Sequence, residues 1–140
     1  MLIPDTLLLA VCAFGADMPA ERVAETIAKG LCAAGMPAPD LCPIEDGPPA
    51  GFDVRMRRAR AVIVGAGRLE RATPATDRRS AGDVFEIATR ARQAGVPAYA
   101  VTGANELDAF DARMFDLQVI LEARSARGLV AAGTELARLA

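Results

Sequence analysis

The residues best suited to chemistry follow the apolar run Ala61–Gly65, where we expect a buried strand to end. The segment GAGRLE begins like a dinucleotide-binding fingerprint, but Glu70 stands where the third glycine would be. Two interpretations stay open. In one, backbone amides and Arg68 hold a phosphate; in the other, the glycines only shape a turn and Arg68 pairs with Asp46 or Glu70. Further cations that could assist Arg68 are Arg71, Arg78 and Arg79.

Cys12, at the end of the first apolar run, is the candidate nucleophile. The chain contains no histidine, which excludes Ser-His-Asp and Cys-His catalysis. A lowered thiol pKa would therefore need an arginine or a helix N-terminus, and a buried structural thiol is the alternative. The three cysteines, Cys12, Cys32 and Cys42, form no CxxC pair and are a poor disulfide framework.

The acids of the loop after Ala98–Thr102 suggest a metal site. Glu106 or Asp108 could hold magnesium together with Asp46, since carboxylate oxygens suit that ion. Asp108 could equally cap a short helix, which would leave Glu106 solvated.

Composition narrows the class of protein. The 140 residues fit one domain, with 52% hydrophobic but only 4% aromatic residues, so the core must be aliphatic. A net charge of −2 gives no electrostatic reason to bind nucleic acid or an anionic membrane. The apolar run Leu7–Phe14 is too short to span a bilayer, and no basic residue precedes it as in a signal peptide. We therefore expect a cytoplasmic protein.

Strands and helices are expected to alternate along the chain. Continuous apolar runs predict strands buried on both faces of a parallel sheet, at Leu7–Ala13, Ala61–Gly65, Ala98–Thr102 and Leu117–Leu121. A fifth, edge strand is expected at Asp40–Ile44, because of Pro43. Helical periodicity predicts helices at Pro19–Ala34, Phe52–Arg58, Ser80–Ala94 and Gly128–Leu139.

This order predicts a three-layer α/β/α fold with a mostly parallel, Rossmann-like sheet of about five strands. Asp17 is the expected N-cap of the first long helix, and Gly35 and Gly95 are expected just beyond helix ends. In such folds ligands bind beyond the carboxyl ends of the strands, which directs attention to the segments around residues 12–19, 45–51, 65–79 and 103–110.

Residues 51–73, GFDVRMRRARAVIVGAGRLERAT, resemble a stretch of the glycerate kinase family of the form GFD-x-x-L-x-x-A-D-L-V-I-T-G-E-G-R-[LI]-D-x-Q-T. PIEDGP, at Pro43–Pro48, resembles that family's P-[VLI]-[AS]-D-G-G-E-G. The resemblance continues in order over nearly the whole chain. It implies ATP and magnesium as cofactors, with Asp46 as a metal ligand. The cofactor-binding residues that it and the glycine pattern imply are Gly65, Ala66, Gly67, Arg68, Leu69, Glu70, Asp46 and Gly47.

The resemblance also implies losses. The family has two α/β domains, and here a second domain would be deleted near residues 48–50. Cys12, Gly15 and Ala66 replace charged residues of the family's motifs, and a further lysine is lost at Thr76-Asp77. Since phosphoryl transfer depends on such charges, we expect weak or lost D-glycerate phosphorylation, with residual binding of a nucleotide or phosphorylated metabolite.

The alternative is a non-catalytic interaction or oligomerisation module, such as a homodimer, because a lost domain would expose apolar surface. Its candidate contacts are Phe52, Met56, Phe110, Met114 and Phe115.

Overall fold

Four of the five strands form where the sequence has continuous apolar runs. The computed structural model describes residues 6–70 and 79–140. Its strands are β1 (Leu7–Val11), β2 (Asp40–Leu41), β3 (Ala61–Leu69), β4 (Ala98–Asn105) and β5 (Leu117–Glu122). All neighbouring strands pair in parallel, in the order β2-β1-β3-β4-β5. The predicted α/β/α fold with a parallel Rossmann-like sheet is thereby confirmed.

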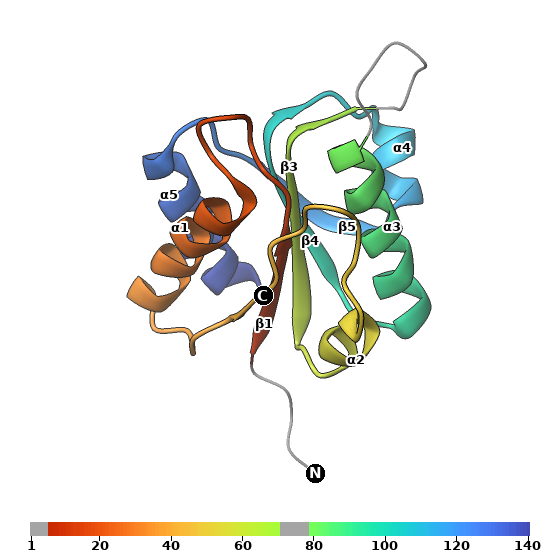
Figure 1. The fold of residues 1–140 in the computed structure, drawn as a ribbon, viewed down its shortest axis with the longest axis horizontal. Helices are drawn as coiled ribbons and strands as arrows, with labels where there is room; N and C mark the ends of the chain where they lie inside the picture. Colours follow the sequence, from red (N-terminus) through yellow and green to blue (C-terminus); the bar gives the residue numbers. More distant parts are fainter. Residues whose placement is uncertain (1–5, 71–78) are drawn as a thin grey trace.

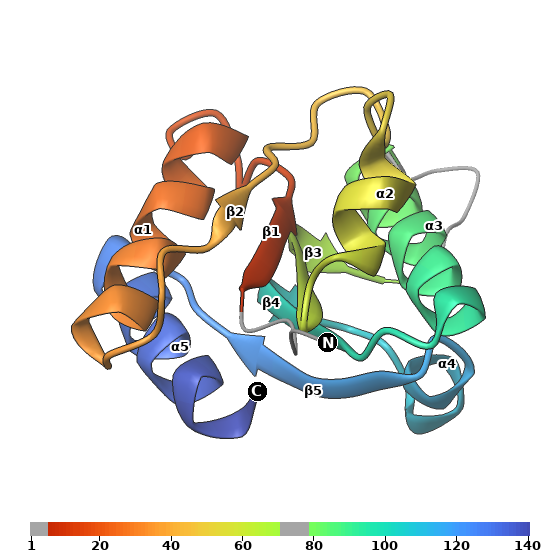
Figure 2. The same cartoon turned by 90° about the horizontal axis from the view of Figure 1, so that it is seen from below.

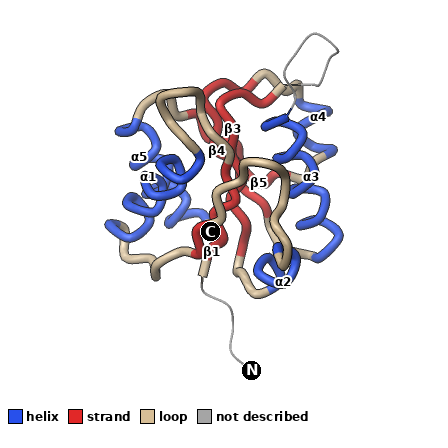
Figure 3. The backbone as a smooth tube through the Cα atoms, in the orientation of Figure 1, coloured by secondary structure: helices blue, strands red, loops and turns tan. Residues whose placement is uncertain are grey.

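Helices cover both faces of this sheet (Figure 1). Helices α1 (Ala20–Ala33) and α5 (Ala126–Leu139) lie side by side on one face. Helices α2 (Phe52–Arg57), α3 (Arg79–Ala94) and α4 (Ala109–Met114) lie on the other. The strands run between the two groups of helices as a twisted middle layer (Figure 3). None of the described helices is long and apolar enough to cross a membrane.

Two apolar clusters fill the space between sheet and helices. Strand residues alternate between them, as the period of a β-strand requires: Leu8 and Ala10 face α2 and α3, whereas Leu7 and Leu9 face α1 and α5. The apolar residues at helical spacing in α1, α3 and α5 are buried, except that Leu139 is half-buried. The buried residues are Val23, Ile27, Leu31, Val84, Ile87, Ala88, Ala91, Leu129, Ala132 and Leu136.

Several predicted boundaries were wrong. β3 runs to Leu69 rather than ending at Gly65, and β4 runs to Asn105 rather than Thr102. The two strands extend together, since Arg68 pairs with Ala104 and Leu69 with Asn105. At the other edge, β2 is only two residues long.

Helix ends show both agreement and difference. Gly35 and Gly95 adopt positive φ angles of 92° and 73° beyond α1 and α3, as predicted. The N-cap of α1 is Pro19 rather than Asp17, and no side chain caps it. Helix α4 was not predicted from periodicity, but the alternative in which Asp108 caps a short helix is the one that the structure shows.

Candidate functional site

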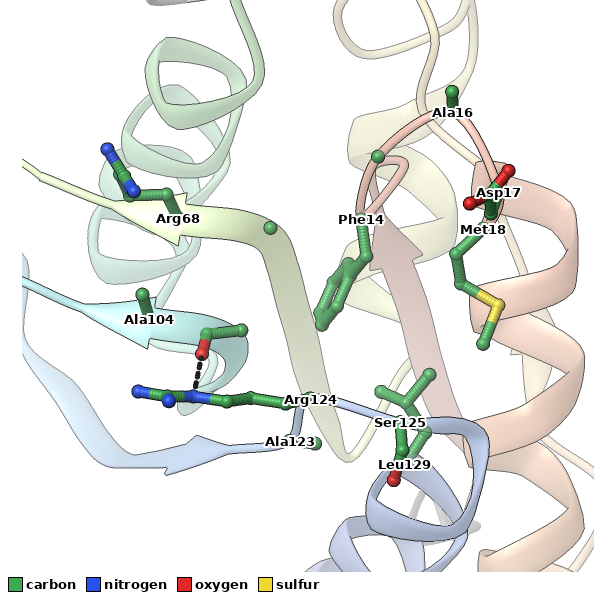
Figure 4. A pocket seen from close by; sticks show the side chains of 13 residues that line it. Phe14, Ala16, Asp17, Met18, Arg68, Ala104, Ala123, Arg124, Ser125 and Leu129 are labelled. Atoms are coloured by element: carbon green, nitrogen blue, oxygen red, sulfur yellow. Dashed lines mark hydrogen bonds between the residues drawn. The ribbon is translucent and has the colours of Figure 1, made fainter.

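The strand order reverses between β1 and β3, and a pocket of about 450 Å³ opens at this end of the sheet. The ends of β1, β3, β4 and β5 and the loops that follow them contribute to it (Figure 4). The lining residues come from the β1–α1 loop, from the ends of β3 and β4, from the loop between β5 and α5, and from α5 itself: Phe14, Gly15, Ala16, Asp17, Met18, Gly67, Arg68, Gly103, Ala104, Ala123, Arg124, Ser125 and Leu129.

Two arginines, Arg68 and Arg124, belong to the lining of this pocket. The side chain of Arg68, at the end of β3, is 60% exposed, and its Nε lies 3.6 Å from Glu106 Oε1. The side chain of Arg124, just after β5, is 79% exposed. Its Nε donates to the Gly103 carbonyl over 3.1 Å, and its Nη2 lies 4.0 Å from Glu122 Oε2. Ion pairs this exposed contribute little to stability, so either guanidinium can turn to another anion at low cost.

The N-terminus of α5 lies at the same pocket. Ser125 caps the helix, and its side chain accepts a hydrogen bond from the Gly128 amide over 3.0 Å. The first amides, at Ala126 and Arg127, have no acceptor within the helix. The positive end of the helix dipole therefore adds to the field of the arginines.

Phe14, Met18 and Leu129 form the apolar part of the wall. Figure 4 shows the Phe14 ring turned toward β3 and the Met18 side chain on the opposite side of the β1–α1 loop. Asp17, the carboxylate among the lining residues, lies in that loop. The pocket thus offers cations, apolar surface and one acidic group within a small volume.

The predicted cofactor-binding residues do not come together. Gly67 and Arg68 line the pocket. Gly65, Ala66 and Leu69 belong to β3 and pair with residues of β4, and Glu70 follows the strand. Asp46 and Gly47 line a separate hollow with Glu21, Pro43, Glu45 and Pro49. Arg71 and Arg78 lie outside the described residues, as do Thr76 and Asp77.

The glycines of GAGRLE have a packing role. A Cβ atom at Gly65 would lie 2.7 Å from the Val101 carbonyl oxygen, and one at Gly67 would lie 3.3 Å from the Phe14 backbone. Both glycines therefore permit close approach of neighbouring backbone, inside a strand rather than in a strand-to-helix loop.

The acids proposed for magnesium are engaged in other contacts. Asp108 caps α4, accepting a hydrogen bond from the Asp111 amide over 2.7 Å, and Glu106 pairs with Arg68. The sequence had left open whether Asp108 holds a metal ion or caps a short helix, and the structure shows the cap. Across residues 6–70 and 79–140, no three Cys, Asp or Glu side chains gather where they could hold a metal ion.

None of the three cysteines forms a disulfide, and two of them are buried. Cys12 is 2% exposed and belongs to the apolar cluster under α2 and α3, which agrees with the structural alternative. Cys42 belongs to the same cluster, and burial raises the pKa of its thiol. Cys32 is exposed on α1.

The candidate interaction residues divide into two groups. Phe52 and Met56 are each only 1% exposed and belong to the core. Phe115 stacks on Phe85, with ring centroids 4.0 Å apart and an interplanar angle of 10°. Phe110 and Met114, in contrast, are 67% and 52% exposed on α4.

Sequence reasoning missed Arg124 and Ser125 as pocket residues, whereas Phe14 lies in the segment 12–19 to which the strand ends directed attention. The signal for the first two was their position directly after the last apolar run. The carboxyl end of that strand lies beside those of the other parallel strands, so a cation there belongs to the same edge.

No family model and no curated protein matches this chain. Among solved structures, it is similar to a proposed pilus assembly-related protein from Burkholderia pseudomallei, with 14% identity and a TM-score of 0.55. The match covers 99% of this chain and 94% of that one. At this identity the similarity concerns the fold alone.

The assignment to the glycerate kinase family was wrong. The matching structure is described as pilus assembly-related, and neither a family model nor a curated protein supports a kinase. The central segment of the resemblance, GAGRL, lies within the buried strand β3, where apolar residues and glycines are required by packing alone. The prediction of a domain deleted near residues 48–50 rested on the same resemblance and stays a prediction.

Proposed function

We propose that this domain binds a small anionic molecule in the pocket at the carboxyl edge of its sheet. The observation that carries the proposal is the presence of Arg68 and Arg124, from two different strand ends, in the lining of one pocket. Guanidinium groups bind phosphate and carboxylate through paired N–H donors. The exposed N-terminus of α5 favours the same ligands.

The other lining residues narrow the ligand class. Phe14, Met18 and Leu129 would contact its carbon skeleton, and a volume of about 450 Å³ suits a metabolite or a nucleotide. Asp17 would accept a hydrogen bond from a hydroxyl or amine of the ligand. A phosphorylated or carboxylated molecule that also carries a hydroxyl or amine therefore fits best.

We propose binding rather than catalysis. The pocket lining contains one carboxylate and no cysteine, its serine, Ser125, is engaged as the N-cap of α5, and the chain has no histidine to act as a base. The partners we propose are this small molecule and, separately, a second copy of the chain. Three cysteines that form no disulfide suit a cytoplasmic setting, which is part of the proposal.

Calorimetric titration with inorganic phosphate, ADP, ATP and phosphorylated three-carbon acids tests the proposal. At least one of these anions is expected to bind, and Arg68→Ala and Arg124→Ala are each expected to weaken it by roughly tenfold or more. Arg22→Ala, an exposed arginine on α1 outside the pocket, is the matched control and should leave the affinity unchanged. Absence of binding by all of these anions, or an unchanged affinity in the Arg68→Ala/Arg124→Ala double variant, would contradict the proposal.

A further inference from the structure

The two arginines of the pocket lie on either side of β4, which separates β3 from β5 in the sheet. Arg68 pairs with Ala104 in the ladder between β3 and β4. Arg124 donates from Nε to the Gly103 carbonyl over 3.1 Å, so it lies at the same level of β4 on the other side. Figure 4 shows Ala104 between the two arginine side chains. The backbones of the two arginines are therefore separated by two interstrand spacings, or about 10 Å.

Each guanidinium group has a carboxylate partner of its own. Arg68 Nε lies 3.6 Å from Glu106 Oε1. Arg124 Nη2 lies 4.0 Å from Glu122 Oε2, and the Asn105 amide donates to that same oxygen over 3.1 Å. These contacts direct the two cations to different partners. They are therefore available to two anionic groups rather than to one.

The wall between the two arginines is made of small residues. Of the lining residues, these are Gly67, Gly103, Ala104 and Ala123. A Cβ atom at Gly103 would lie 2.6 Å from the Gly67 carbonyl oxygen, so the backbones of β3 and β4 approach closely there. Because none of these side chains is larger than a methyl group, a ligand can lie across the strand ends from one arginine to the other.

We infer that the ligand of this pocket carries two anionic groups, one bound by Arg68 and the other by Arg124. The inference rests on the proposed anion binding and narrows the class of ligand. A single exposed guanidinium binds an anion weakly, because solvent screens the pair and Glu106 or Glu122 competes for the cation. A second anionic group on the same molecule binds intramolecularly, at a high effective concentration, so two weak contacts reinforce each other.

The two anion positions differ in what surrounds them. Arg124 directly precedes Ser125, the N-cap of α5, so an anionic group at Arg124 also meets the first amides of that helix. This position should favour a phosphate, which has the higher charge. The position at Arg68 should accept a phosphate or a carboxylate, since a guanidinium binds both.

Propylphosphonate and propane-1,3-bisphosphonate test the number of anionic groups, because they share a carbon chain and differ in the second phosphonate. Calorimetric titration should show roughly tenfold or more tighter binding of the bisphosphonate. In the series from ethane to hexane bisphosphonates, affinity should pass through a maximum at the chain length that best spans the two guanidinium groups. Equal affinity for the two propyl probes would overturn the inference and leave the proposed anion binding intact.

Arginine variants test whether the preference comes from these two side chains. In Arg68→Ala and in Arg124→Ala the ratio of the two affinities should fall to about twofold or less, since only one anion position remains. The two side chains are 60% and 79% exposed, so both variants should keep the thermal stability of the parent protein. Arg22→Ala, on α1 outside the pocket, is the matched control and should keep the full ratio.

A preference for the bisphosphonate that persists in both pocket variants would overturn the inference, because the second anionic group would then be bound elsewhere. Absence of binding by either probe would overturn it as well. The titrations with inorganic phosphate and nucleotides then decide separately whether the pocket binds anions at all.

Discussion

The two helical layers are attached to the sheet in different ways. On one face, α1 and α5 cross at a pair of glycines, and a Cβ atom at Gly30 would lie 2.0 Å from the Val130 carbonyl oxygen. A Cβ atom at Gly133 would lie 2.2 Å from the Ile27 carbonyl oxygen. Backbone contacts backbone there, and the two helices share one cluster of buried side chains.

On the other face the short helices make individual polar and aromatic contacts in addition to the buried apolar cluster that contains Phe52 and Met56. α4 begins at the Asp108 cap and ends beside the Phe85–Phe115 stack, and Arg92 donates to the Met114 carbonyl over 3.0 Å. α2 is joined to β2 by a bidentate pair of Arg55 and Asp40. Both layers pack on the sheet through a buried apolar cluster. The first layer adds a close backbone contact between its helices, and the second adds separate polar and aromatic contacts, which predicts different responses to substitution.

The largest expected effect is at the glycine contact. Gly30→Ala should lower the free energy of unfolding by about 3 kcal/mol, because α1 and α5 must move apart to admit the methyl group. Gly82→Ala, in α3, is the matched control: nothing lies within 4 Å of the added Cβ atom. It should raise the free energy of unfolding by about 0.5 kcal/mol through helix propensity. Chemical denaturation measures both, and a stabilising Gly30→Ala would show that the helices do not meet as closely as described.

The second prediction concerns the side chains that cap the N-termini of α4 and α5. Asp108→Ala and Ser125→Ala each remove a side-chain acceptor and should cost about 1 kcal/mol of helix stability. α4 has six residues and α5 has fourteen, so the consequences should differ in extent. Hydrogen exchange should accelerate only in and near α4 for Asp108→Ala, but throughout the molecule for Ser125→Ala. Equal, global acceleration in both would mean that α4 unfolds only together with the whole domain.

This difference also explains what the sequence could predict of the fold. α1, α3 and α5 have apolar residues at helical spacing, and the strands are continuous apolar runs, so hydrophobic pattern alone locates them. α4 has no such pattern. Asp111 is its one buried residue and Phe110 and Met114 face outward, so only its cap and the contacts of its neighbours reveal it.

The site was harder to predict than the fold. The glycines at 65 and 67 have the spacing of a phosphate loop, yet whether they turn the chain or sit inside a strand depends on what packs against them. Arg124 follows an ordinary apolar strand, and its closeness to Arg68 depends on β3, β4 and β5 being neighbours in the sheet. That adjacency is a property of topology, which local sequence does not contain.

The smallest expected effect is the loss of an exposed ion pair, and we compare one pair from each layer: Arg55–Asp40 and Arg138–Glu135. Arg55 donates from Nε to Asp40 Oδ2 over 2.9 Å and from Nη2 to the Leu41 carbonyl over 2.9 Å, and its hydrogen bonds with Asp40 raise the pKa of Arg55. Both side chains are more than a third exposed, so solvent screens the pair. Asp40→Asn should lower the free energy of unfolding by about 0.5 kcal/mol. The loss should shrink in 1 M salt, where the screening length is only about 3 Å.

Glu135→Gln on α5 is the matched control, because Glu135 pairs with Arg138 on the exposed side of a helix that backbone packing already holds. It should leave stability unchanged at both salt concentrations. If Glu135→Gln were as costly as Asp40→Asn, the polar contacts would not distinguish the layers. The difference between them would then reside in the glycine crossing alone, since that contact is made by backbone atoms and is insensitive to salt.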